Sequence, residues 1–198
     1  MTAMRARSGL PALAILVLLA SPATAERAGS DGPAWAALAQ GGHVALVRHG
    51  RAPGRTPDPP NFRIGDCATQ RGLDERGRAD AAALGAAFRR NGVEVGRTLS
   101  SPWCRCLETA RLMGHEPEIF DALYNLMGPD PDRERQRRDF RAVVSAWRGP
   151  GTLLMVSHGV TIRFLTDAYP AQGEVIVLAP APDEERGFRV VGRIAPGG

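Results

Sequence analysis

The sequence has no lysine, only three cysteines, and no apolar run approaching about 18 residues, the length that crosses a bilayer. All 25 basic residues are arginine, a composition consistent with a GC-rich genome that by itself indicates no function. No paired Cys-x-x-Cys with partner ligands is present, which disfavours a zinc site. The sequence has no cluster of carboxylates of the kind that binds a divalent cation. We therefore expect no metal and no cofactor.

The positive charge of the chain is modest. The formal net charge of +4 falls to +2 without Arg5 and Arg7, because 4 − 2 = 2. The densest basic run, 133–141, is interleaved with acidic residues, as on a solvated helix face. Nucleic-acid binders usually carry a one-sided basic stripe. We expect no nucleic-acid partner.

The N-terminus has the order of a secretory signal peptide. Arg5 and Arg7 precede the apolar stretch 10–20, and the small residues Ala-Thr-Ala follow. This pattern predicts a signal peptide over 1–25 and a single domain over 26–198, with no membrane span after cleavage. The mature protein is then periplasmic or secreted. The alternative is a retained membrane anchor.

Predicted helices and strands alternate along the rest of the chain. Helices are expected over 33–40, 74–91, 102–114, 132–147 and 160–168, and strands over 43–48, 97–100, 118–120, 152–157, 174–179 and 188–194. Asp74 is a favourable cap for the second helix. Such alternation predicts a three-layer α/β/α sandwich with a mostly parallel central sheet.

Three predicted strands are each followed by residues that bind anions. Arg48 and His49 follow the first strand, Arg105 follows the second, and His158 follows the fourth. Ligands bind at the carboxyl ends of strands in open α/β sheets, so these side chains are expected to meet in one pocket.

The residue types in this pocket suit a phosphoryl group. Arginine grips two oxygens at once and stays charged at any accessible pH. Neutral histidine can attack phosphorus and form a covalent intermediate. Each motif by itself also fits an ordinary turn after a strand or the capped first turn of a helix. The three motifs in this order favour phosphoryl chemistry.

The chain resembles the histidine phosphatase superfamily, with its phosphoglycerate-mutase-like fold. The matching motifs are Arg48-His49-Gly50, Leu73-Asp74-Glu75-Arg76-Gly77, Ser101-Pro102-Trp103-Cys104-Arg105-Cys106-Leu107-Glu108-Thr109-Ala110 and Ser157-His158-Gly159. The resemblance implies that His49 is the nucleophile that becomes phosphohistidine. It also implies that Arg48, Arg105 and His158 hold the phosphoryl oxygens. Two further segments, 65–71 and 173–174, are similar to small exported bacterial members.

One departure from the family concerns the acid that protonates the leaving oxygen. Asn125 stands where many members have a glutamate, and an amide cannot deliver a proton. Another carboxyl is one alternative, with Glu174 the first candidate and Asp121 the second. A leaving group that needs little protonation is another, and slow turnover is a third.

The long irregular connection 50–72 is expected to cover the pocket, because such loops in compact domains are usually functional or disordered. Arg71 is its best candidate for substrate binding. A disulfide from Cys67 to Cys104 or Cys106 would tie this loop to the Arg105 segment in an oxidising compartment. Three unpaired thiols are the alternative.

The sequence thus predicts a phosphomonoester hydrolase that acts through phosphohistidine on a small phosphorylated substrate, such as an envelope phosphosugar. Membership of the family also allows a mutase, but export from the glycolytic pool argues against one. The alternative from another class is a phosphate-ligand-binding protein with little or no turnover, motivated by Asn125.

Overall fold

The computed structural model describes residues 31–197, so the predicted signal peptide over 1–25 lies outside the described residues. The helices are α2 (Gly32–Ala39), α3 (Glu75–Arg90), α4 (Cys104–Leu112), α5 (Arg133–Ala146) and α6 (Gly159–Thr166), with short 3-10 turns η1 (Cys67–Thr69) and η2 (Asp121–Leu123). The strands are β1 (Val44–Arg48), β2 (Val95–Ser100), β3 (Glu118–Ile119), β4 (Thr152–Ser157), β5 (Val175–Pro180) and β6 (Phe188–Ile194). Every element expected from the sequence is present.

The six strands form one sheet in the order β3-β2-β4-β1-β5-β6. Strands β1 to β4 pair in parallel, whereas β5 and β6 join as antiparallel neighbours. The predicted mostly parallel sheet is therefore confirmed. Strands β2, β4 and β1 are adjacent and parallel, so their carboxyl ends share one edge of the sheet.

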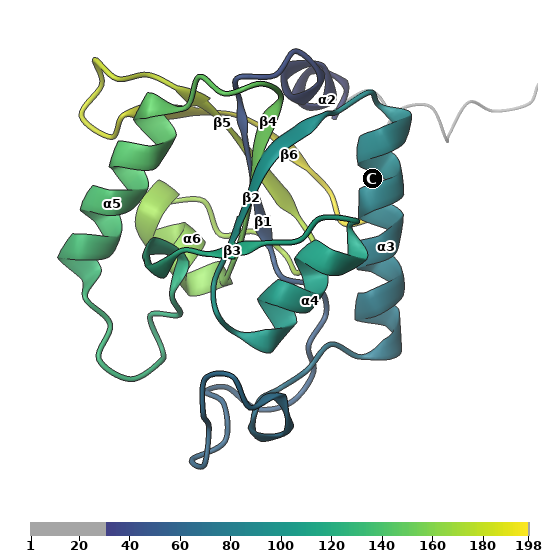
Figure 1. Ribbon diagram of the computed structural model, residues 1–198, viewed down its shortest axis with the longest axis vertical. Helices are drawn as coiled ribbons and strands as arrows, with labels where there is room; N and C mark the ends of the chain where they lie inside the picture. The colour runs from purple at the N-terminus through teal and green to yellow at the C-terminus, as the bar shows by residue number, and fades with distance from the viewer. Residues whose placement is uncertain (1–30, 198) are drawn as a thin grey trace, which may run out of the picture.

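Helices cover both faces of the sheet (Figure 1). One apolar cluster joins α2, α3 and α4 to one face, with Trp35, Phe88 and Trp103 among its larger members. The other cluster joins α5 and α6 to the opposite face, with Phe140 and Ile162 among its members. Strands buried on both faces explain the near-continuous apolar runs of the sequence. The three-layer α/β/α arrangement is confirmed.

Helix starts differ slightly from the predicted ones. The carboxylate of Asp74 accepts a 2.7 Å hydrogen bond from Gly77 N, so it caps α3 as expected. Helix α4 begins at Cys104 with Trp103 as its N-cap. Pro102, predicted to lie in the first turn, precedes this helix, because Trp103 is extended.

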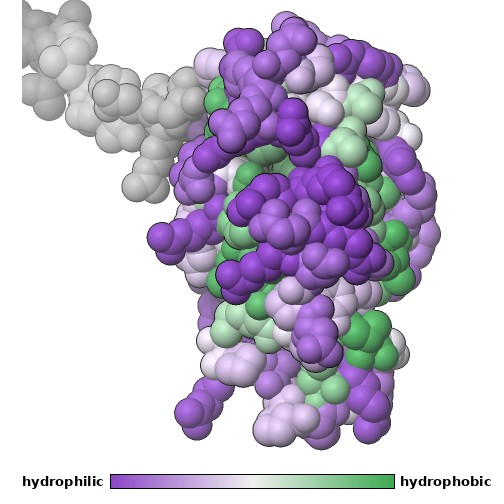
Figure 2. All heavy atoms as spheres, turned by 90° about the vertical axis from the view of Figure 1, so that its left-hand side faces the viewer, coloured by the Kyte–Doolittle hydropathy of each residue, from purple (hydrophilic) through white to green (hydrophobic). Residues whose placement is uncertain are grey.

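The outer surface of the molecule beside α5 is mainly hydrophilic (Figure 2). Its basic residues pair with acidic neighbours, as Arg137 does with Glu134 and Arg138 with Asp139. The basic run therefore lies on a solvated helix face with mixed charge. Within residues 31–197, no helix combines the length and hydropathy needed to span a bilayer.

Close packing of α3 on α4 gives a test of the fold. A Cβ on Gly85 would lie 2.3 Å from Met113 O, whereas a Cβ on Gly32 would meet nothing within 4 Å. Alanine normally stabilises a helix over glycine by up to about 1 kcal/mol. We expect Gly32→Ala to be neutral or stabilising and Gly85→Ala to destabilise by roughly 1–3 kcal/mol, because overpacking forces the backbone apart. Urea unfolding measures both, and a stabilised Gly85→Ala variant would contradict this packing.

Candidate active site

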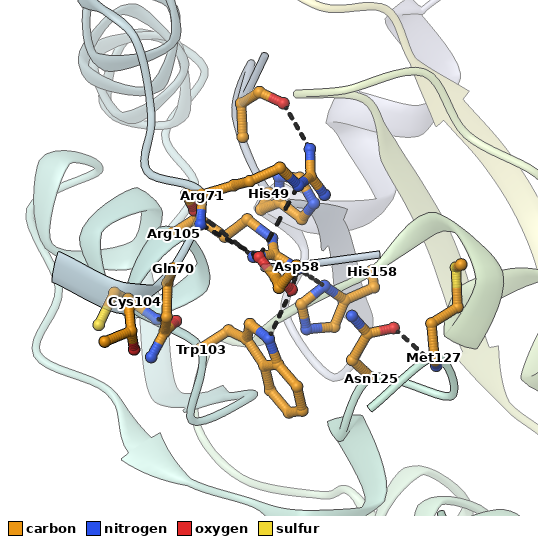
Figure 3. A network of polar contacts seen from close by, with 12 residues as sticks. His49, Asp58, Gln70, Arg71, Trp103, Cys104, Arg105, Asn125, Met127 and His158 are labelled. Carbon is orange, nitrogen blue, oxygen red and sulfur yellow. Dashed lines mark hydrogen bonds and ion pairs between the residues drawn. The ribbon is translucent and has the colours of Figure 1, made fainter. Parts of the chain in front are cut away.

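Four residues from three strand ends come together at one edge of the sheet. Arg48 ends β1 and His49 follows it, His158 follows β4, and Arg105 lies in the first turn of α4. The His49 and His158 rings lie 5.4 Å apart between centroids. The Arg105 Nη2 atom lies 3.4 Å from His158 Nδ1 (Figure 3). The structure thus brings the predicted residues into one cluster.

One hydrogen bond fixes the tautomer of His49. Its Nδ1 lies 2.8 Å from the carbonyl oxygen of Gly50. Because a carbonyl only accepts, Nδ1 carries the proton and Nε2 keeps its lone pair. Gly50 is held in turn by its N–H bond to Thr109 Oγ1, and a Cβ there would lie 2.9 Å from Gly77 O. Because Gly50 has no Cβ, the segment that carries His49 can pack closely against α3.

Both site histidines are buried and neutral. Burial, followed by the charge of Arg105, lowers the pKa of His49 to about 3. Burial and then the neighbouring His49 and Arg105 hold the pKa of His158 well below its usual value. Two uncharged imidazoles therefore lie beside fixed guanidinium charges at neutral pH.

His158 links Arg105 to a serine. A guanidinium only donates, so His158 Nδ1 accepts from Arg105 and Nε2 carries the proton. Nε2 lies 2.8 Å from Ser101 Oγ and donates to it. Ser101 lies in one of the motifs that carry the family resemblance, but no local pattern indicates its contact with His158.

Residues of the segment 169–174 contact the Arg48 guanidinium. The Arg48 Nη1 atom donates to Pro170 O at 2.8 Å, and its guanidinium lies 5.4 Å from the Tyr169 ring centroid. On its other side, a Cβ at Gly159 would lie 3.0 Å from the Arg48 Cζ atom. The glycine of the Ser157-His158-Gly159 motif therefore makes room for the guanidinium.

Arg71, the predicted substrate-binding residue of the long loop, also reaches the site. Its Nη1 donates to Ala52 O at 2.8 Å, and its Nε lies 3.7 Å from a carboxylate oxygen of Asp58. The other loop arginines lie outward: Arg51 pairs with Asp74 and Arg63 with Asp66.

Three guanidinium N–H groups at this site have no hydrogen-bond partner among the described residues. They are the buried Nε atoms of Arg48, Arg71 and Arg105. Buried donors without an acceptor are costly, and guanidinium donors favour anions with several oxygens. No group of three or more metal-ligating side chains lies together within 31–197. The donor set of this site suits an oxyanion.

Asp58 is a site residue that the sequence reasoning missed. Its Oδ1 accepts from Arg105 Nη1 at 2.9 Å and from the Arg71 amide at 3.1 Å. Its Oδ2 accepts from Arg105 Nη2 and from the Trp103 indole, both at 3.1 Å (Figure 3). Burial acts to raise the pKa of Asp58, but hydrogen bonding to Arg105 and its charge outweigh burial, so the pKa lies below its usual value.

The candidate proton donors lie in other surroundings. Glu174 Oε1 accepts from Arg193 at 2.6 Å, and Oε2 accepts from the Ala171 amide, so this carboxylate stabilises the turn before β5. Asp121 is exposed and lies 3.7 Å from Arg135. Asn125 is buried, its Oδ1 accepts from Met127 N, and its amide nitrogen lies on the His158 side (Figure 3).

The cysteines form one disulfide, Cys67–Cys104, and one buried thiol, Cys106. Of the two predicted pairings, the structure has the one with Cys104. Gln70 Oε1 also accepts from Cys104 N, so two contacts fasten the end of the long loop beside Arg105. Burial raises the pKa of the Cys106 thiol to about 12, which leaves it protonated and a poor nucleophile.

A family comparison matches residues 44–124 to the histidine phosphatase superfamily (branch 1). The matched range includes Arg48, His49, Asp58 and Arg105, while His158 lies beyond it. The resemblance inferred from the motifs is confirmed. No curated protein gives a significant match to the sequence.

Solved structures share the fold at low sequence identity. The protein histidine phosphatase SixA, complexed with tungstate, has a TM-score of 0.56 at 19% identity, covering 78% of this chain and 97% of that chain. An open-reading-frame product from Mycobacterium tuberculosis has a TM-score of 0.56 at 17% identity, covering 79% and 98%. A mycobacterial glucosyl-3-phosphoglycerate phosphatase, complexed with VO3, has a TM-score of 0.55 at 14% identity, covering 76% and 97%.

The disulfide gives a stability prediction. Cys67 and Cys104 are 37 residues apart, and in the chain-entropy model closing such a loop contributes about 3–4 kcal/mol. We expect Cys67→Ser to lower the free energy of unfolding by about this amount, measured in urea without reductant. The Cys106→Ala control keeps the disulfide, so its stability should still fall when reductant is added. If reductant left the free energy of unfolding of the wild-type protein unchanged, the prediction would be wrong.

The neutral histidines give a pH prediction. The pKa of His49 in the folded protein lies below the unfolded value of about 6.5, so the unfolded chain binds more protons between about pH 6.5 and 3. The free energy of unfolding should therefore fall with acidification, by up to about 1.4 kcal/mol per pH unit for this residue. His49→Asn should have a shallower slope in urea unfolding at successive pH values. An NMR titration of His49 with a midpoint near 6.5 would contradict this.

Proposed function

With residues 44–124 matching the histidine phosphatase superfamily (branch 1), we propose that this protein is a phosphomonoesterase whose nucleophile is His49. The family match supports a phosphatase. The finer assignment of a phosphohistidine intermediate rests on the side chains of this chain. The substrate we propose is a small phosphorylated molecule.

One observation carries the proposal: a neutral imidazole with a free Nε2 lies among three guanidinium groups. The Gly50 carbonyl holds the proton on His49 Nδ1. The Nε atoms of Arg48, Arg71 and Arg105 are buried donors without partners in the described chain. A nucleophile surrounded by oxyanion donors is what phosphoryl transfer needs, since positioning and charge stabilisation supply most of its catalysis.

In the proposed first step, His49 Nε2 attacks phosphorus, an N–P bond forms, and the P–O bond to the leaving group breaks. Arg48 and Arg105 stabilise the charge on the equatorial oxygens. His158 holds an oxygen of the same group once its Nε2 N–H turns from Ser101 to the phosphoryl group. In the second step water attacks phosphorus, the N–P bond breaks, and inorganic phosphate leaves. Because burial and the charge of Arg105 lower the pKa of His49 to about 3, its Nε2 lone pair stays available at neutral pH.

Asn125 affects the fate of the leaving oxygen. Its amide can donate a hydrogen bond to this oxygen but cannot protonate it. Glu174 and Asp121 remain our candidates for the acid, each after a change in its present contacts. Without an acid, substrates with good leaving groups should turn over fastest.

Asn125 also favours the second candidate function, a phosphate-binding protein with little turnover. In that case the guanidinium cluster binds phosphorylated ligands, and the phosphohistidine forms slowly or not at all.

We further propose that the protein acts outside the cytoplasm. The Cys67–Cys104 disulfide supports an oxidising compartment. The signal-like sequence over 1–25 supports export, and the product would be periplasmic or secreted. Phosphosugars of the cell envelope are then the first substrate class to test.

The test compares wild type with His49→Asn and with His115→Asn, a matched control at a histidine that follows the end of α4 and lies near Arg89. We expect p-nitrophenyl phosphate turnover in wild type, little change in the control, and a loss of about 10³-fold or more in His49→Asn. Labelled substrate should leave an acid-labile phosphoprotein in wild type and in the control, but not in His49→Asn. Tight phosphate binding without turnover would favour the binding protein instead, and full activity of His49→Asn would refute this nucleophile.

A further inference from the structure

The carboxylate of Asp58 occupies both terminal nitrogens of Arg105, which form the fork that a phosphoryl group could use. Both terminal nitrogens of Arg105 bond to it, one to each oxygen, at 2.9 and 3.1 Å. The Arg71 amide and the Trp103 indole complete the set, so each carboxylate oxygen accepts two hydrogen bonds. The Asp58 side chain is only 8% exposed. This arrangement is a built anion site that already contains an anion from the chain itself.

Arg105 cannot bind two anions through the same edge. Its planar fork grips a carboxylate or a phosphoryl group by two parallel N–H bonds. In this structure that edge belongs to Asp58, while the Nε atom has no partner among the described residues. A phosphoryl group that uses the fork must therefore displace the carboxylate.

The charges of the cluster indicate which ligands can do so. Arg48, Arg71 and Arg105 bring three positive charges, Asp58 brings one negative charge, and both histidines are neutral. A monoanion brings no more negative charge to the Arg105 guanidinium than the Asp58 carboxylate that it replaces. A phosphomonoester dianion offers more, and it also brings three terminal oxygens to the unpartnered Nε donors.

The loop around Asp58 is fastened unevenly. The disulfide at Cys67 and the Gln70 bond to Cys104 N hold its second half to α4. The first half, 53–61, is largely exposed apart from Asp58 (Figure 1). Phe62, stacked on Trp103 at 5.1 Å, lies between the two halves. The Asp58 arm can thus leave the site while the tethered half stays in place.

We propose that Asp58 is an internal competitor for the phosphoryl site, and that its displacement from Arg105 makes the site selective for phosphomonoester dianions over monoanions. The proposal rests on the phosphatase or phosphate-binding function proposed above. It adds a specificity-determining residue and a condition for binding: the ligand must be a better partner for Arg105 than a carboxylate already in contact with it.

The first experiment measures binding of inorganic phosphate by calorimetry at about pH 8, where it is mainly a dianion. Wild type is compared with Asp58→Asn and with the control Asp66→Asn, which removes the same charge from the same loop beside Arg63. We expect Asp58→Asn to bind phosphate about tenfold more tightly or better, because a charge-assisted pair no longer has to break. The control should bind like wild type. Equal or weaker binding by Asp58→Asn would refute competition and make Asp58 a positioning residue for Arg105.

The second experiment tests selectivity with dimethyl phosphate, a monoanion that has two terminal oxygens. Wild type should prefer inorganic phosphate over this probe, and the preference should shrink several-fold in Asp58→Asn. An unchanged ratio would show that Asp58 does not determine which anion binds. The melting temperature and the intact disulfide of each variant show whether it is folded.

A third measurement uses wild type alone, so it does not depend on a variant folding. Saturating phosphate should increase hydrogen exchange at the Arg71 amide, because this N–H donates to Asp58 Oδ1 and loses its acceptor when the arm is released. The amides of Thr69 and Gln70, which donate to backbone carbonyls in the tethered half, should stay protected. Unchanged or slower exchange at Arg71 with unchanged Thr69 and Gln70 would mean that Asp58 stays in place, which refutes displacement. Because these measurements need no turnover, they separate this proposal from the catalytic one. Turnover without tighter binding in Asp58→Asn refutes only the competitor, whereas tighter binding without turnover refutes only the enzyme.

Discussion

Three guanidinium groups lie together in this protein, with Arg105 fully buried and Arg48 and Arg71 partly buried, and the rest of the site follows from that constraint. Like charges in a poorly solvated site repel unless anions and dipoles compensate them. Arg48 has the Pro170 carbonyl and the Tyr169 ring, Arg71 has the Ala52 carbonyl, and Arg105 has Asp58. Burial lowers the pKa of both imidazoles, and the arginine charges lower it further, so both histidines stay neutral. A site that repels protons and cations is suited to a neutral nucleophile and an anionic ligand.

The disulfide that fastens the long loop helps to hold these charged groups together. The disulfide joins the loop to the residue next to Arg105, so the loop that supplies Asp58 and Arg71 is covalently fixed to the helix that supplies Arg105. An apolar stack of Phe62 on Trp103 continues the contact toward Asp58. Stability of the loop and charge balance of the site are therefore coupled.

Some features of the site could be predicted because they depend on short-range order. Arg48, His49 and His158 follow apolar strands that must be buried, and neighbouring parallel strands end at the same edge of the sheet. Other features depend on contacts that no local pattern encodes. Asp58, followed by two prolines, reads as an ordinary turn residue, yet its partner Arg105 is 47 residues away. Glu174 directly precedes β5 and lies near Arg48, but the antiparallel neighbour β6 presents Arg193 to it. Neither the Asp58–Arg105 contact nor the Glu174–Arg193 contact can be predicted from the periodicity of the sequence.

The sequence alone determined the layered sheet, the edge at which the candidate site lies, and the histidines and arginines gathered there, because burial and strand direction depend on patterns a few residues long. Only the tertiary structure decided which cysteine pairs with Cys67. On α4, Cys104 and Cys106 are two residues apart and so point about 200° from one another, the first toward the loop and the second into the core. The tertiary structure also decided that the loop places a carboxylate against Arg105, since that contact joins segments whose approach depends on the packing of the whole domain.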